Sequence, residues 1–171
     1  MTSPTALGQA SARPVAELEM LGEASKVRLR VAAQILLSRE FPPGVDSLVR
    51  NSLRHEPPRP IEIEQAIELT EEAVMPLASH FADSTELLLQ GSGGLLIARN
   101  LNAGGMVRTL LTLDEVEILF NRLVSVSEGR PTSQETLPTD ARFVAAMLIL
   151  REFMHHLHFS RVTLQTSRDQ E

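Results

Sequence analysis

The chain of 171 residues is long enough for one domain with a sizeable core, and its 43% hydrophobic and 22% charged residues are typical of a globular protein. Its net charge of −6 disfavours broad contact with nucleic acid or anionic lipid. The absence of cysteine excludes disulfides and Cys-ligated metals, and no apolar run is long enough to insert in a membrane, so a cytoplasmic protein is expected.

The first third of the chain carries a helical pattern. Residues 1–12 are small and polar, which predicts a disordered tail. Residues 13–56 begin with apolar and small residues at alternating three- and four-residue steps, the spacing of one helix face. The segment Phe41-Pro42-Pro43-Gly44 then ends this helix, and a shorter helix follows. We therefore predict an N-terminal helical hairpin, whose first helix has an inward face of Val15, Leu18, Gly22, Ser25, Leu29, Ala32 and Leu36.

A proline-rich connector at residues 57–60 precedes an expected α+β core over residues 61–160. Residues 61–81 are ambiguous, because the first four alternate as a strand would, whereas the apolar residues keep helical spacing for five turns. A helix interrupted at Pro76 is the favoured interpretation, with a short strand at residues 60–64 as the alternative. The acidic residues of this segment are interpreted as the solvated side of that helix; they are Glu62, Glu64, Glu68, Glu71 and Glu72.

Residues 86–115 determine the predicted fold class. Three short apolar runs are separated by glycine-rich breaks at residues 90–94 and 102–105. We predict a three-stranded antiparallel meander packed against helices, and hence an α+β fold. The two breaks are interpreted as hairpin turns that need positive φ. A phosphate-binding loop would need a helix directly after it, and the predicted strand leaves no place for one.

Two helices are expected in the last third, before a tail at residues 161–171. Thr112 and Glu115 form a capping box for the first helix, and Thr139 or Asp140 caps the second. The second helix is apolar on most of its circumference. Packing one of its faces on the sheet would leave other apolar faces without cover. Because uncovered apolar faces normally mark association, we predict a homodimer with an interface that includes Val144, Leu148 and Ile149.

The end of the last helix carries the strongest candidate for a metal site. Glu152, His155 and His156 lie at helical neighbour spacing, and His158 follows. A glutamate three residues before a histidine is the unit that carboxylate-bridged metal bundles repeat, and this chain has no second copy unless a dimer supplies it. The alternative is a polar helix end, where imidazolium meets the negative end of the helix dipole, or a pH-responsive interface.

No catalytic triad, phosphate loop, dinucleotide fingerprint or complete metal set is recognised in the sequence. We therefore predict a non-catalytic cytoplasmic accessory protein without a cofactor, which acts as a homodimer and binds another, unidentified macromolecule. Two alternatives stay open. One is a protein that binds a divalent metal ion through the Glu/His residues just named. The other is an enzyme or small-ligand protein with a pocket between sheet and helices, where an anion is held by Arg99, Arg108 or Asp114.

Overall fold

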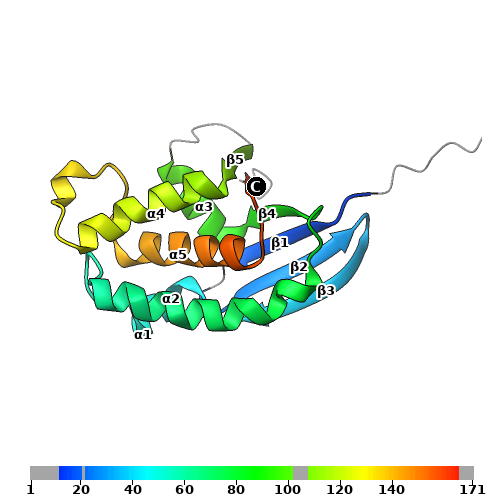
Figure 1. Cartoon of the computed structure of the whole chain (residues 1–171), viewed down its shortest axis with the longest axis horizontal. Helices are drawn as coiled ribbons and strands as arrows, with labels where there is room; N and C mark the ends of the chain where they lie inside the picture. Colours follow the sequence, from blue (N-terminus) through cyan, green and yellow to red (C-terminus); the bar gives the residue numbers. More distant parts are fainter. Residues whose placement is uncertain (1–11, 21, 102–107, 166–171) are drawn as a thin grey trace, which may run out of the picture.

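The computed structural model describes residues 12–20, 22–101 and 108–165, which form one mixed β-sheet with helices packed on it (Figure 1). In chain order, the elements of this described part are β1 (Val15–Met20), β2 (Ser25–Val31), β3 (Gln34–Phe41), α1 (Val45–Asn51), α2 (Pro60–Val74), the 3-10 helix η1 (Met75–His80), β4 (Glu86–Gln90), α3 (Gly91–Asn100), β5 (Arg108–Thr112), α4 (Leu113–Ser127), the 3-10 helix η2 (Thr132–Gln134), α5 (Ala141–His156) and β6 (Arg161–Gln165).

The six strands of the described residues are arranged in the order β3-β2-β1-β4-β6-β5. β4 lies between β1 and β6 and is parallel to both, with Leu18 opposite Leu89 and Leu87 opposite Val162. The other neighbouring pairs are antiparallel. Because β1, β4 and β6 run the same way, all three finish at one end of the sheet, which we call the carboxyl end of the sheet.

Only one face of the sheet contributes to the main hydrophobic core. Along β1, Ala16, Leu18 and Met20 are buried, and the alternate positions of β4 and β6 join them in a core cluster with residues of the helices. The opposite face carries charged pairs: Arg28 Nε lies 3.2 Å from Glu17 Oε2, and Arg28 also contacts Glu19. This alternation is the period-two pattern of strands with one face packed.

The first helix of the predicted N-terminal hairpin was wrong, because residues 15–41 form the three strands β1, β2 and β3. The shorter second helix is confirmed as α1. The apolar residues of the segment 15–41 fit the helical period and the two-residue period of a strand. The segment forms strands, because Ala16 and Leu18 pack inward while the charged residue between them pairs across strands. Breaks also oppose a helix here. Gly22 lies in the β1–β2 turn, and Ala32 adopts a positive φ of 53° in the β2–β3 turn, a conformation that a helix does not contain.

The predicted three-stranded meander was also wrong, although the α+β class is confirmed. Residues 91–100 are the helix α3 instead of a hairpin and a second strand, and β4 and β5 are separated in the sheet by β6. Both neighbours of β4 come from segments far away in the sequence. The local spacing of apolar runs could therefore not reveal them. The second glycine-rich break, at residues 102–105, lies outside the described residues.

The apolar helix α5 occupies the centre of the core. Val144 is 2% exposed, and Leu148 and Ile149 are fully buried. The helices α1, α2, α3 and α4 all pack against α5 (Figure 1). The residues predicted to form a dimer interface are therefore covered by the chain itself. The sequence argument failed because it could not know that the N-terminal strands and four helices provide that cover.

Several other expectations are confirmed. Residues 61–74 are helical within α2, and the 3-10 helix η1 contains Pro76. Thr112 and Glu115 form the predicted capping box of α4, and the Asp140 side chain accepts a hydrogen bond from Phe143 N at the start of α5. The expected C-terminal tail needs correction, because residues 161–165 form the strand β6 inside the sheet.

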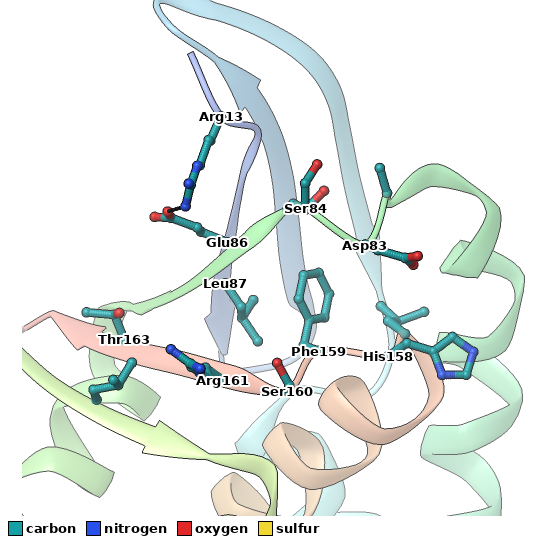
Figure 2. Close-up of a pocket in the computed structure, with 14 residues that line it drawn as sticks. Arg13, Asp83, Ser84, Glu86, Leu87, His158, Phe159, Ser160, Arg161 and Thr163 are labelled. Carbon is teal, nitrogen blue, oxygen red and sulfur yellow. Dashed lines mark ion pairs between the residues drawn. The ribbon is translucent and has the colours of Figure 1, made fainter. Parts of the chain in front are cut away.

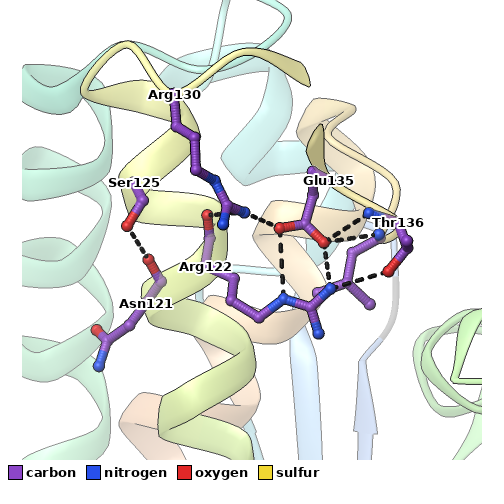
Figure 3. Close-up of polar contacts among 7 residues, drawn as sticks. Asn121, Arg122, Ser125, Arg130, Glu135 and Thr136 are labelled. Carbon is purple, nitrogen blue, oxygen red and sulfur yellow. Dashed lines mark hydrogen bonds and ion pairs between the residues drawn. The ribbon is translucent and has the colours of Figure 1, made fainter. Parts of the chain in front are cut away.

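A buried carboxylate ties α4 to the segment that leads into α5 (Figure 3). Glu135, whose side chain is 1% exposed, forms ion pairs with Arg122 and Arg130. Its Oε1 also accepts hydrogen bonds from the backbone N–H groups of Thr136 and Leu137, at 2.8 and 2.9 Å. Although burial alone would raise the pKa of this carboxyl, these donors hold it at about 2.

Candidate functional site

The carboxyl end of the sheet has the geometry of an anion site. The strand β4 passes directly into α3 through the sequence Gly91-Ser92-Gly93-Gly94, and Gln90 before it makes no side-chain cap hydrogen bond. The first N–H groups of a helix have no partners within the helix, and they meet the positive end of the helix dipole. A glycine-rich strand-to-helix turn of this kind presents backbone donors to a phosphate or carboxylate.

Each glycine in this turn has a structural reason. Gly91 adopts a φ of +73°, which favours glycine. A Cβ on Gly93 would lie 2.6 Å from the Cβ of Met20, and a Cβ on Gly94 would lie 3.1 Å from Leu89 Cγ. The turn is therefore pressed against β1 and its own strand: Gly93 and Gly94 are buried, whereas Gly91 and Ser92 are exposed at the end of the sheet.

This turn lies where the chain changes direction across the sheet. From β1 the chain continues into the antiparallel β2 on one side, while the parallel β4 lies on the other side and leads into α3. In open α/β sheets, ligands bind outside the carboxyl ends of the strands, at the point where the chain leads away from two neighbouring strands in opposite directions along the sheet. The interpretation of residues 90–94 as a hairpin turn was wrong, because α3 begins at Gly91.

The β1–β2 turn faces the first turn of α1 at the same end of the sheet. Gly44 N donates to Glu23 O and Ser47 N donates to Gly22 O, both at 3.0 Å. The exposed Glu23 forms a bidentate pair with Arg50, and this hydrogen bonding lowers the pKa of the Glu23 carboxyl below its usual value. Ser47 N, one of the first donors of α1, is thus used within the chain.

Glu19 is the acidic side chain beside the α3 turn. A Cβ built on Gly91 would lie 3.8 Å from both Cβ and Cγ of Glu19. Its carboxylate contacts Arg28, and its side chain is 23% exposed. A half-buried carboxylate next to a set of backbone donors can orient a water molecule or accept its proton.

A second group of ionisable residues lies at the far end of α5. Glu152 is fully buried; its Oε1 lies 2.5 Å from Arg151 Nη1 and its Oε2 lies 3.1 Å from His156 Nε2. Glu71 of α2 joins them, with Oε1 at 3.9 Å from His156 Nε2. The three potential ligand atoms of Glu71, Glu152 and His156 all lie within 4.8 Å of one another. We call these three residues the Glu/His cluster.

Only two of the four residues predicted for a metal site meet in this cluster. His155 points to another partner, since its Nδ1 lies 3.3 Å from Glu117 Oε1. His158 lies beyond the end of α5 with a positive φ of 61°. The sequence argument missed Glu71, because it assigned every glutamate of α2 to the solvated face. No spacing within the sequence links α2 to α5.

The residues proposed to hold an anion between sheet and helices belong to three different elements. Arg99 is exposed in α3, whereas Arg108 is the first residue of β5 and Asp114 lies in the first turn of α4. A polar pocket of about 460 Å³ lies instead at the amino ends of β4 and β6, opposite the carboxyl end of the sheet (Figure 2). Arg13 and Glu86 point toward each other at its rim, 3.8 Å apart. The buried hydroxyl of Thr85 also lines the pocket and has no hydrogen-bond partner among the described residues.

The fold matches solved structures of known proteins, whereas no protein-family profile and no curated protein matches the sequence. The Ppx/GppA phosphatase of Aquifex aeolicus, type II variant, is 13% identical with a TM-score of 0.70, over 90% of this chain and 53% of that one. An exopolyphosphatase from Cytophaga hutchinsonii is 16% identical with a TM-score of 0.69, over 94% of this chain and 55% of that one. The chain thus spans about half the length of the structures it matches.

These neighbours contradict the predicted non-catalytic accessory role. Two of the proteins that share the fold are named as a phosphatase and an exopolyphosphatase, which are enzymes. The ground for the predicted homodimer interface, an apolar face of α5 without cover, is absent, because these residues of α5 are buried within the chain. Within residues 12–20, 22–101 and 108–165, no helix has the length and apolarity needed to cross a membrane.

Proposed function

We propose that this chain binds the terminal phosphate of a polyphosphate or related phosphoanhydride at the start of α3 and takes part in its hydrolysis. The observation that carries the proposal is the uncapped, glycine-rich β4–α3 turn at the change of strand order beside β1. The likeness of the fold to an exopolyphosphatase over 94% of the chain supports the same class of substrate. The protein acts in the cytoplasm in this proposal, as the sequence predicts.

The substrate would be held by backbone N–H groups at the start of α3, where Gly91 and Ser92 are exposed. Such donors stabilise an anion without a lysine, which suits a chain whose Arg28 and Arg50 are engaged with Glu19 and Glu23. The helix dipole adds a favourable field at the same point. Since glycine residues leave no side chain over these donors, a phosphate group can approach them directly.

In the hydrolytic step, Glu19 is the proton acceptor. The oxygen of a water molecule attacks the terminal phosphorus while the bond from phosphorus to the bridging oxygen breaks. The Glu19 carboxylate takes the proton of that water, and the shortened substrate leaves with the bridging oxygen. Because the chain spans about half the length of its structural neighbours, further groups of the site belong to a second domain or chain in this proposal.

The decisive experiment measures binding of pyrophosphate and of medium-length polyphosphate to the purified chain by calorimetry. Ser92→Asp places a negative charge in the first turn of α3, which the dipole tolerates but a phosphate does not. We expect it to weaken binding on the order of tenfold, with a smaller effect at high salt. Ser133→Asp, at an exposed position of η2, makes the same charge change away from this turn and is expected to bind as the native chain does.

Hydrolysis is followed separately by phosphate release. Glu19→Gln is expected to bind polyphosphate normally and to lose phosphate release, because only the proton acceptor is removed. If the native chain binds neither anion, or if Ser92→Asp and Ser133→Asp behave alike, the phosphate site is refuted. If binding is retained and phosphate release is unaffected by Glu19→Gln, the role of Glu19 is refuted.

A further inference from the structure

The structure assigns a second site, distinct from the α3 turn: we propose that the Glu/His cluster of Glu71, Glu152 and His156 binds one divalent transition-metal ion such as Zn²⁺. Two carboxylates and one imidazole form the type of three-residue ligand set that leaves a fourth position for water. The proposal does not depend on phosphate binding at the carboxyl end of the sheet.

The spacing of the ligand atoms suits such an ion. Zn²⁺ bonds of about 2.1 Å in a tetrahedral site place neighbouring ligand atoms roughly 3.4 Å apart. The distances from His156 Nε2 are 3.1 Å to Glu152 Oε2 and 3.9 Å to Glu71 Oε1. Small rotations of the half-exposed Glu71 side chain would bring the three atoms to equal spacing. The ligands come from α2 and α5, two packed helices, so the backbone positions are fixed.

The charge balance also favours a cation. Glu152 is fully buried, and burial of a carboxylate is costly unless it is compensated. Arg151 compensates one of the two carboxylates through Oε1 of Glu152, which leaves Oε2 free to face His156. One negative charge therefore remains among Glu71, Glu152 and Arg151. A divalent ion, or a proton on His156, would offset it.

The choice between the metal classes follows from the donors. Imidazole nitrogen suits zinc, copper, iron and nickel, whereas magnesium and calcium prefer all-oxygen sites. The exposed fractions of the His156 and Glu71 side chains, 20% and 41%, leave a path for the ion and space for a water ligand. Binding of Zn²⁺ to the cluster can be measured with the metal alone, in the absence of phosphate.

The chain offers matched controls for each ligand. His155 is the neighbour of His156 on α5 but contacts Glu117, and Glu72 is the exposed neighbour of Glu71 on α2. The full chain, freed of metal by a chelator, is titrated with Zn²⁺ by calorimetry and with Co²⁺ by visible absorption, which reports a four-coordinate site. His156→Ala, Glu71→Gln, His155→Ala and Glu72→Gln are treated in the same way.

We expect one Zn²⁺ per chain, with binding weakened by His156→Ala beyond the roughly 10–100-fold that loss of a supporting group costs. Glu71→Gln weakens it less, while His155→Ala and Glu72→Gln bind as the native chain does. The proposal is overturned if the native chain shows no saturable Zn²⁺ site, or if the four variants are affected equally. His156 would then act only as the ion-pair partner of Glu152.

Discussion

Met20 and Gly93 are in direct contact where β1 ends and α3 begins: a Cβ on Gly93 would lie only 2.6 Å from the Cβ of Met20. Both atoms belong to fixed backbone elements, so neither can move aside as the end of a flexible side chain would. This contact sets how closely the start of α3 approaches the strand and therefore where the first N–H groups of the helix lie.

Gly93→Ala is expected to lower the free energy of unfolding by about 1–3 kcal/mol, the cost of overpacking a tight site. Alanine favours a helix over glycine by about 1 kcal/mol, so the propensity alone predicts the opposite sign. Urea denaturation of Gly93→Ala and of the exposed neighbour Ser92→Ala separates the two effects. A Gly93→Ala protein more stable than the native chain would show that α3 does not pack on Met20 as described.

The sequence could predict those elements whose signals are local. The capping box of Thr112 and Glu115 marks the start of α4 because both partners lie within one turn. The spacing of the apolar residues in 143–157 likewise predicted the helix α5. The class α+β followed from the presence of both periods in one chain, and it is confirmed although the strands were partly assigned to the wrong segments.

The sequence could not predict what depends on distant segments. Residues 15–36 fit a helical period and a strand period alike, and only the pairing of β1 with β4 decides between them. Glu71 and His156 meet because α2 packs on α5. One signal for α3 was present: Gly93, Gly94, Ile97 and Ala98 share one buried helix face, once glycine is counted as a packing residue.

The capping box gives a second prediction. Thr112 Oγ1 accepts a hydrogen bond from Glu115 N at 3.2 Å, and Thr112 N donates to Glu115 Oε2 at 2.7 Å. Thr112→Ala removes the first bond and should lower the free energy of unfolding by about 1 kcal/mol. Thr112→Ser keeps a hydroxyl at the same place and is the control. Equal losses for both variants in thermal denaturation would mean that the methyl group, and not the cap, is responsible.

The burial of α5 gives a third prediction. Leu148 is fully buried within the chain, so Leu148→Ala should lower the free energy of unfolding by roughly 2–5 kcal/mol. The loss should be the same at low and high protein concentration, because the contacts lie within one molecule. Ile118→Ala, at a position 61% exposed on α4, serves as the control with little effect. A loss that grows on dilution would instead place Leu148 at an interface between chains.

Glu135 gives a prediction for the dependence of stability on pH. The hydrogen bonds and ion pairs from Arg122, Thr136 and Leu137 outweigh burial and hold the pKa of this carboxyl at about 2, below its usual 4.5 (Figure 3). The group therefore stabilises the folded state above pH 4.5 and loses that contribution as the pH falls toward 2. The difference between the two values corresponds to about 3 kcal/mol.

Glu135→Gln should remove this part of the pH dependence. We expect the urea midpoint of the native chain to fall steeply between about pH 5 and pH 2, and that of Glu135→Gln to start lower and fall less. Glu64→Gln, on the exposed side of α2, controls for the loss of one carboxylate. Parallel curves for the native chain and Glu135→Gln would show that Arg122 and Arg130 do not hold this carboxylate in its charged form.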